Sequence, residues 1–517
     1  MQSLSLTSLP AWSAFKQAVQ QAAPDLEQLR LIDAAGLSVD FSGQRQSPAL
    51  QQAAAELLEQ RHFQEQRKLL LSGGIANPTE HRAAWHNLLR APAATADVMH
   101  ERERLNAFVR DADLARRWRH IVHIGIGGSD WGVRLSVGAF GYTKLWREVR
   151  FVANIDGHAI EAGLADLNPH DTLVVVASKS FTTAETLQNG QRALEWLQAA
   201  GVKNPFDQVV AITAHPERAA EWGVAPRHIF KLWDWVGGRF SLWSSVGLTT
   251  ALSVSSDVVA GMRSGAAAMD HHFETAPIES NAPVQMALHG IANRSVLGIA
   301  SLNIAPYDSR LINLVPYIQQ LEMESLGKSV DIAGNPVPVP TGPVVWGMPG
   351  TDAQHTFFQW LHQGSDGAAV DFIMCQQADH RWKNHHQSLL ANCLAQREAM
   401  LRGKTVEQAY EECIKQGHTP KESEWLAKHR VHQGGRPNTL IVLPRLTPYH
   451  LGALLALYEH KVFVQAVIWG INPFDQWGVE YGKHLASDII DELNDQPCVK
   501  AHDASTSHWI NLLKNQL

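Results

Sequence analysis

Residues 121–130, IVHIGIGGSD, place a short apolar run directly before a glycine-rich turn. The run at Ile121–Ile126 is almost continuously apolar, as expected for a strand of a parallel sheet that is buried on both faces. The glycines after it let backbone N–H groups approach a ligand closely. A G-x-G-x-x-G dinucleotide pattern fails because Asp130 takes its sixth position. We therefore expect a strand that leads into either a tight structural turn or a phosphate-binding loop.

Similar apolar runs follow in two sets, separated by segments long enough for crossover helices. The first hundred residues instead show helical spacing, as in Pro48–Leu71. The pattern predicts an α/β fold with two doubly wound, mainly parallel-sheet subdomains and additional helices. The predicted strands are Ile121–Ile126, Arg150–Ile155, Thr172–Ala177 and Gln208–Thr213, then Ser295–Ser301, Val344–Gly347, Phe372–Cys375 and Leu440–Leu443.

The predicted domain organisation has three parts. Residues 1–115 form an N-terminal helical part of the large domain, 116–265 form a smaller phosphate-binding subdomain, and 266–517 form the larger subdomain with C-terminal helices. Ligands of such folds bind at the carboxyl ends of the strands, so the loops there are the candidate site.

Composition disfavours several classes of function. The 517 residues carry a net charge of -7, whereas nucleic-acid binders usually have a basic surplus. The four cysteines form no C-x-x-C pair, and neighbours such as His271 and His272 point apart on a helix, so we expect no metal.

The N-terminus does not have the pattern of a signal peptide. The apolar stretch Leu451–Ile471 is interrupted by charged residues and is interpreted as a buried helix. We expect a cytoplasmic protein without a membrane span.

A second loop is rich in hydroxyl groups. After Thr172–Ala177 the chain reads SKSFTTAE, residues 178–185, and Thr182 with Glu185 fits a capping box that would begin a helix. A helix N-terminus, hydroxyl donors and Lys179 together favour a phosphate site. The alternative is an ordinary helix cap with a solvated lysine.

A third loop frames an arginine with glycines. The string DWVGGRFSLWSSVG runs from Asp234 to Gly247, and Gly237 and Gly238 precede Arg239. Paired glycines allow unusual backbone angles, and a fixed guanidinium suits an oxyanion. The alternative is a surface arginine after a turn, which the apolar neighbours of Arg239 disfavour.

These loops resemble motifs of the glucose-6-phosphate isomerase family. The Arg239 string and NPFDQWGVEYGK, 472–483, look like its two signatures, and IGIGGSD and SKSFTTAET look like its sugar-isomerase (SIS) phosphate loops. QQLEMESLGK, 319–328, resembles the catalytic-base segment. TGPVVWGMPGTDAQHTFFQWLHQG, 341–364, resembles the histidine segment. A weaker match is NPTEHRAAWHNLLR, 77–90.

The resemblance implies reversible isomerisation of glucose 6-phosphate and fructose 6-phosphate through a cis-enediol(ate), in glycolysis and gluconeogenesis, with no cofactor. Glu324 would be the base, His355 and Lys483 would open the sugar ring, and Arg239 would stabilise the enediolate. The family is a homodimer in which the partner supplies the histidine, here His355. The implied substrate-binding residues are Gly128, Ser129, Ser178, Lys179, Ser180, Thr183, Gln320 and Gln476.

Four positions depart from the family pattern, and two alternatives stay open. Leu326 replaces a usual Asn, Glu322 an Asp, Met348 a Glu and Ser180 a Thr. One alternative is a related isomerase that acts on mannose 6-phosphate. The other is an SIS-type module that senses phosphosugars and regulates a partner. Such a module needs the hydroxyl-rich loop but no base, ring-opening histidine or lysine.

Overall fold

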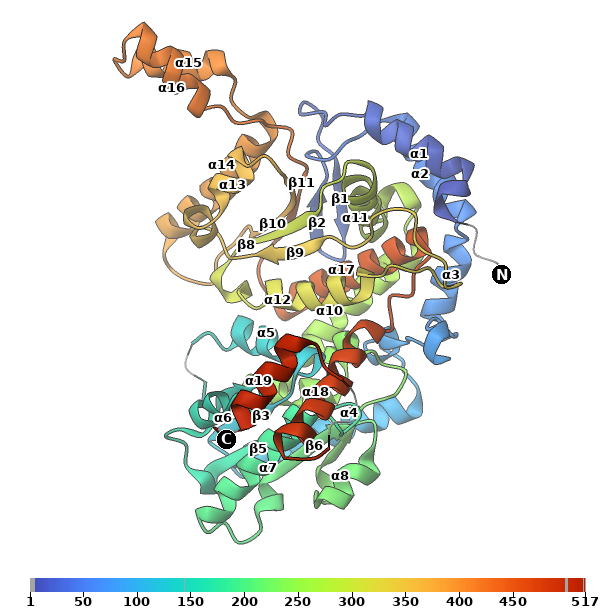
Figure 1. The fold of residues 1–517 in the computed structure, drawn as a ribbon, viewed down its shortest axis with the longest axis vertical. Helices are drawn as coiled ribbons and strands as arrows, with labels where there is room; N and C mark the ends of the chain where they lie inside the picture. Colours follow the sequence, from blue (N-terminus) through green and yellow to red (C-terminus); the bar gives the residue numbers. More distant parts are fainter. Residues whose placement is uncertain (1–4, 144, 498–500, 515, 517) are drawn as a thin grey trace. The chain divides into compact units, whose positions relative to one another are not determined.

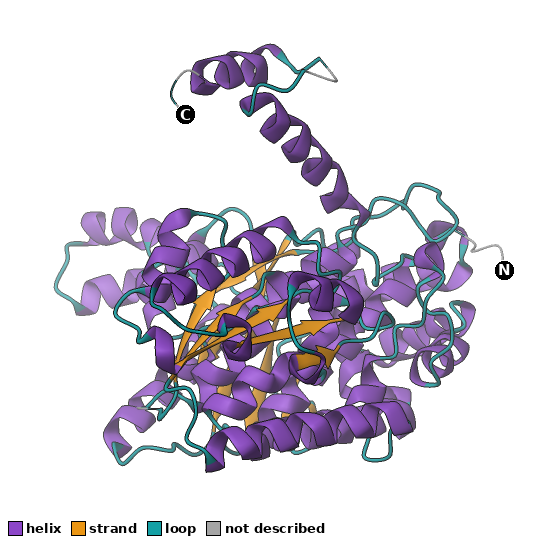
Figure 2. Cartoon of the chain, turned by 90° about the horizontal axis from the view of Figure 1, so that it is seen from below, coloured by secondary structure: helices purple, strands orange, loops and turns teal. Residues whose placement is uncertain are grey.

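Two β-sheets with helices around them make up the computed structural model (Figure 1), and helices predominate (Figure 2). The structure describes residues 5–143, 145–497, 501–514 and 516. The chain up to Pro473 forms one compact unit, and Phe474–Leu517 form a second. The second unit contains the helices α18 (Glu480–Leu493) and α19 (Ala504–Lys514).

The smaller sheet has five parallel strands. Their order is β4 (Glu148–Val152), β3 (His120–Ile124), β5 (Thr172–Ala177), β6 (Val209–Thr213) and β7 (Ile229–Lys231). The four predicted strands are confirmed with boundary shifts, and β7 was missed because three residues carry too little pattern. Its helices are α5 (Trp131–Phe140), α6 (Gly157–Leu164), α7 (Ala184–Ala199) and α8 (Pro216–Trp222).

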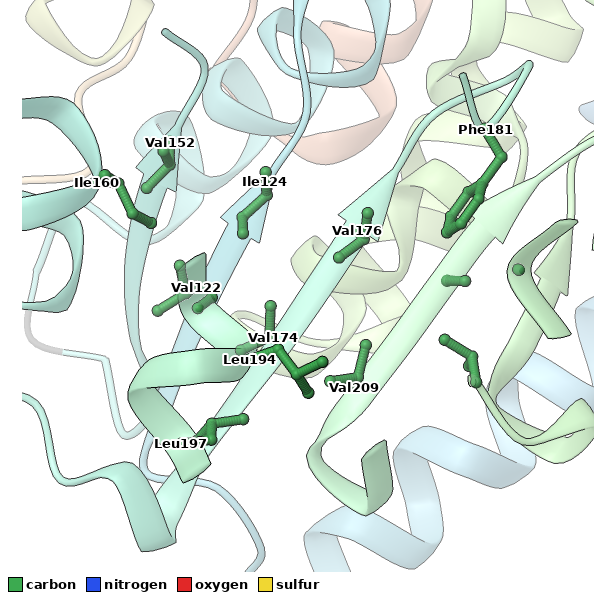
Figure 3. Close-up of a cluster of buried hydrophobic side chains, with 14 of the residues drawn as sticks. Val122, Ile124, Val152, Ile160, Val174, Val176, Phe181, Leu194, Leu197 and Val209 are labelled. Carbon is green, nitrogen blue, oxygen red and sulfur yellow. The ribbon is translucent and has the colours of Figure 1, made fainter. Parts of the chain in front are cut away.

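Aliphatic side chains on one face of this sheet form a dry core with the helices. Val122, Val174 and Val176 are fully buried, and Leu194 and Leu197 of α7 pack over them (Figure 3). Because β-branched side chains pack well on a pleated surface, this core fixes where β3 and β5 end. The loops that follow those strands start from rigid positions.

The larger sheet has six strands and mixed direction. Their order is β1 (Leu31–Ala34), β2 (Leu37–Asp40), β11 (Asn438–Leu443), β10 (Ala368–Cys375), β8 (Ser301–Tyr307) and β9 (Val344–Gly347). The last four strands in this order are parallel, whereas β2 is antiparallel to both of its neighbours. With two mainly parallel sheets, the predicted α/β fold class is confirmed.

Two local predictions are wrong. The first hundred residues are not all helical, because residues 31–40 form a hairpin whose turn at Ala35 and Gly36 has positive φ. Ser295–Ser301 is not a strand: Ala292–Val296 is a π-helix, and β8 begins only at Ser301. In both places a short apolar run fits strand and helix alike, and tertiary pairing decides between them. The predicted domain boundaries at 115/116 and 265/266 stay a prediction.

The N-terminal helices are α1 (Pro10–Gln21), α2 (Pro48–Gln60), α3 (Phe63–Leu71) and α4 (Ala96–Leu114). The predicted Pro48–Leu71 helix therefore breaks in two, at His62, whose φ is 52°. Later come α9 (Leu248–Ser253), α10 (Ser256–Thr275), α11 (Ala282–Ile291), α12 (Leu314–Gln319), α13 (Phe358–Gln363), α14 (Lys383–Arg402), α15 (Val406–Lys415) and α16 (Pro420–His429).

The helix α17 (Pro448–Trp469) confirms the predicted buried helix. It packs along α10 (Figure 1) and also contacts α11. Among the described residues it alone has the length and apolar composition to cross a membrane, yet 94% of its apolar window lies buried inside the protein.

Candidate active site

The first glycine loop packs directly against the arginine loop. After β3, Gly127–Ser129 form a 3-10 turn, and Ser241 Oγ donates a hydrogen bond to the carbonyl of Gly128 (3.2 Å). A Cβ on Gly128 would lie 1.9 Å from the carbonyl oxygen of Gly238. Only glycine therefore allows this approach, which brings the first and third predicted loops together.

The hydroxyl-rich loop leads from β5 into α7. Ser178 Oγ donates to Thr183 Oγ1 (3.1 Å) and accepts from the backbone N–H of Phe181 (3.1 Å). The predicted capping box is wrong, because Thr183 is the N-cap and Thr182 instead donates to Ser180 Oγ (2.8 Å). The Thr183 side chain caps none of the first N–H groups of α7. A helix N-terminus whose first N–H groups have no side-chain cap, with several hydroxyl groups beside it, is suited to binding a phosphate.

Lys179 connects this loop to the arginine loop. Its ammonium donates to the carbonyl oxygens of Asp234 and Val236, both at 2.8 Å. Burial, together with the positive charges of Arg82 and Arg239, lowers the pKa of Lys179 to about 8. Lys179 therefore holds the backbone just before Arg239 through two hydrogen bonds. That its positive charge also lies near a bound phosphate stays a prediction.

Arg239 is a buried cation in the 3-10 segment Gly238–Trp243. Its Nε donates to Ser325 Oγ (2.6 Å), its Nη2 donates to the carbonyl of Pro473, and its Nη1 lies 3.3 Å from Glu324 Oε2. The alternative of a solvated surface arginine is therefore wrong. A guanidinium held at all three nitrogens is a fixed positive charge.

Glu324 ends a π-helical turn, Gln320–Glu324, which continues α12. Gln320 Nε2 donates to Glu324 Oε2 (3.0 Å), so these side chains share a face as predicted. A Cβ on Gly127 would come within 2.9 Å of Gln320 Nε2. Because π-helical turns are rare and occur often at functional sites, the local backbone also marks this carboxylate.

Of three further predicted residues, His355 belongs to the first unit, whereas Gln476 and Lys483 belong to the second. His355 ends the 3-10 turn Asp352–His355, is exposed, and has no hydrogen-bond or ion-pair partner in the described part of the chain. In the second unit, Gln476 precedes Trp477, and Lys483 on α18 is exposed and pairs with Glu480 (3.0 Å). The structure thus unites Gly128, Gln320, Glu324 and Arg239, and among the described residues no side-chain hydrogen bond or ion pair joins His355 to them.

The sequence analysis did not single out Ser325, which follows Glu324 in the chain and is completely buried against Arg239. Two of the departures have physical reasons. Leu326 is completely buried, so an apolar side chain suits its position, and Glu322 is paired with the buried Lys461. Among the residues that the structure describes, no three His, Cys, Asp or Glu side chains are grouped to hold a metal ion.

Comparison with known proteins identifies the family. The family model described as phosphoglucose isomerase matches residues 40–510. This chain belongs to that family. Among phosphoglucose isomerase relatives, the glucose-6-phosphate isomerase of Bordetella avium is 56% identical over 516 residues, 99% of each chain. That of Caulobacter vibrioides is 43% identical over 501 residues, 93% of each. A crystal structure of a glucose-6-phosphate isomerase from Chlamydia trachomatis superposes with a TM-score of 0.86 at 28% identity, covering 99% of this chain and all of that one.

Proposed function

We propose that this protein reversibly isomerises glucose 6-phosphate and fructose 6-phosphate, in glycolysis and gluconeogenesis, without a cofactor. The observation that carries the proposal is the Glu324–Arg239 pair, which lies against the loop that follows β3 and whose arginine loop contacts the hydroxyl-rich loop through Lys179. Curated relatives that match nearly the whole chain are named for this activity. A carboxylate beside a fixed cation is the arrangement that proton transfer next to a carbonyl needs.

The phosphate of the substrate would be held at the start of α7 by Ser178, Ser180 and Thr183. Hydroxyl donors and the N-terminal N–H groups supply neutral and dipolar contacts, and Lys179 adds positive charge. Gly128, Ser129, Gln320 and Gln476 would contact the sugar. Binding the distant phosphate orients the reacting carbons, which lowers the barrier of the chemical step.

The chemical step moves one proton between neighbouring carbons. His355 and Lys483 first open the ring by transferring a proton between the C1 hydroxyl and the ring oxygen. Glu324 then removes the proton from C2 of the aldose, which leaves an enediolate, and returns it to C1, while the hydroxyl proton passes from O2 to O1 to give the ketose. The negative charge that develops on the enediolate oxygens is stabilised by Arg239, which needs no reorganisation because it is already held in place.

We further propose a cytoplasmic homodimer in which each subunit's His355 serves the partner's site. The exposed position of His355, whose side chain has no hydrogen-bond or ion-pair partner among the described residues, supports this assignment. Mixing two inactive variants tests it. Heterodimers of His355→Ala and Glu324→Gln would contain one intact site, so a 1:1 mixture would recover about a quarter of wild-type activity. No recovery in a mixture shown to exchange subunits would contradict a shared site.

The first experiment assays the purified wild type in a metal-chelating buffer. Fructose 6-phosphate is supplied, and glucose 6-phosphate is followed with a coupled dehydrogenase. We expect robust turnover. No turnover by folded protein would overturn the proposal and favour the sensing module, and turnover of mannose 6-phosphate in a parallel assay would widen the substrate range.

A further inference from the structure

The apolar helix α17 carries three polar side chains in succession at its middle, Glu459, His460 and Lys461. They are 1%, 0% and 3% exposed. Burying charge is costly unless each group is paired and hydrogen-bonded. In this fold each of the three reaches a different segment of the chain, and two of those segments carry the Glu324–Arg239 pair.

Lys461 reaches the segment that carries Glu324. Its ammonium forms an ion pair with Glu322, whose side chain is fully buried. Glu322 lies inside the π-helical turn, two residues before Glu324. Because both charges are removed from water, letting the turn move away from α17 would leave two unpaired buried charges. The turn is therefore tied to α17.

Glu459 reaches the segment that carries Arg239. Its Oε1 accepts a hydrogen bond from Trp243 Nε1 (2.8 Å), and its Oε2 pairs with Arg90. Trp243 ends the 3-10 segment Gly238–Trp243, and the Arg90 guanidinium lies 4.9 Å from the centre of its ring. The arginine loop is thus tied to α17 two residues away from the Lys461 anchor.

His460 makes a different kind of contact. Its Nε2 lies 2.6 Å from Asp270 Oδ1 on α10, and Asp270 in turn pairs with Arg90, so His460 reaches the arginine segment through two further residues. Among the three side chains, only Glu459 and Lys461 directly contact segments of the candidate site.

We propose that Glu459 and Lys461 are positioning residues that set the separation of Arg239 and Glu324. The inference rests on the proposed catalytic roles of that pair. Both anchors are on one rigid helix, so the two segments keep a fixed spacing even though 85 residues of sequence separate Glu324 from Arg239. A displacement of about 1 Å at reacting groups can reduce the rate about 100-fold, so such a scaffold directly controls turnover.

The test removes one anchor together with both charges of its ion pair. A double variant, Glu322→Leu with Lys461→Met, replaces the ion pair by apolar side chains of similar size, a change that proteins often tolerate. We expect a folded protein whose kcat falls about 10- to 100-fold while KM changes less than about twofold. Lys461→Arg keeps the ion pair and should retain most of the kcat.

A matched control variant removes an ion pair that lies far from the site in the sequence and in the order of the sheet. Asp40 on β2 pairs with Arg397 on α14 (2.9 Å), and the double variant Asp40→Leu with Arg397→Met should leave kcat unchanged. A wild-type kcat in the folded Glu322→Leu, Lys461→Met protein would overturn the proposal. If that variant does not fold, Trp243→Phe is the deciding test, since it removes just the indole N–H that donates to Glu459. A reduced kcat supports the scaffold, and an unchanged kcat overturns it. Failure of the catalytic assignment itself shows separately, as activity that survives in Glu324→Gln.

Discussion

The guanidinium of Arg239 lies 3.3 Å from the carboxylate of Glu324, and both groups are held by further partners. Ser325 and the Pro473 carbonyl fix the arginine, while Gln320 orients the glutamate. Both groups therefore occupy defined positions before substrate arrives. Preorganised charge of this kind is usually the largest contribution to transition-state stabilisation.

Arg239→Lys should reduce kcat by about 100- to 1000-fold, because an ammonium cannot keep the three contacts of the planar guanidinium. KM should change much less, since the charge on the enediolate develops only during reaction. Steady-state kinetics of folded protein checks this. Ser325→Ala, which removes only the Nε partner, should cause a smaller loss, and equal losses in both variants would contradict a role for Arg239 beyond packing.

The KM for glucose 6-phosphate should rise as pH increases above about 8. The pKa of Lys179 is lowered to about 8 in the folded chain, so its positive charge disappears in this range and the attraction for phosphate weakens. Lys179→Met should have a higher KM at pH 7 and no further rise between pH 7 and about 9. The exposed Lys203→Met serves as the control and should keep the wild-type profile. A wild-type KM that is flat across this range would contradict the role of Lys179.

The lowered pKa of Lys179 also affects the free energy of unfolding. Between about pH 8 and the ordinary lysine value of 10.5, the unfolded chain binds a proton that the folded chain does not. The contribution of Lys179 to the free energy of unfolding therefore increases as pH rises through this window. Urea unfolding of wild type and Lys179→Met at pH 7.5 and pH 10 measures it, and the wild type should gain stability relative to the variant at the higher pH.

Gly128→Ala should lower both stability and activity, because its methyl group would collide with the backbone of Gly238 and Arg239. Overpacking against backbone costs about 1–3 kcal/mol of unfolding free energy, and it displaces the arginine. Gly157→Ala is the matched control, since a Cβ there has no atom within 4 Å. Wild-type kcat in Gly128→Ala would show that the close approach of the two loops is dispensable.

Asp371→Asn should stabilise the protein at neutral pH. Burial and the nearby Glu322, opposed by Lys461, together raise the pKa of Asp371 to about 6. The folded chain thus holds a proton between about pH 4 and 6 that the unfolded chain has lost, so this group's contribution to stability falls as pH rises through that window. Unfolding midpoints at pH 4.5 and pH 7 should show a benefit of the variant only at pH 7. The surface change Asp111→Asn should show no such difference.

Much of the parallel framework could be predicted because buried strands such as Thr172–Ala177 are continuous apolar runs with their own boundaries. The hairpin at 31–40 could not, because strands of four residues show no clear alternation and β2 pairs with β11, some 400 residues later. The π-helix at Ala292–Val296 was misread for a related reason: its sequence suits several backbones, and its packing selects one.

At the candidate site, the glycine and hydroxyl loops were visible as local motifs, and family resemblance marked Glu324 and Arg239. Their contact was not predictable from spacing, because it depends on how the two sheets are arranged in the larger unit. Nor could the sequence show that the charged residues interrupting Leu451–Ile471 would pair with the site segments. Buried partners come from distant parts of the chain, and a local pattern says only that they must exist.

The central claim is that Glu324 carries the proton between C1 and C2. Glu324→Gln keeps the size of the side chain and its hydrogen bond to Gln320, and it removes the basic carboxylate. With fructose 6-phosphate in chelating buffer, the kcat of a folded Glu324→Gln protein should fall about 100- to 10,000-fold, while the protein still binds the sugar phosphate. Near wild-type turnover by this variant would contradict the assignment of Glu324 as the base.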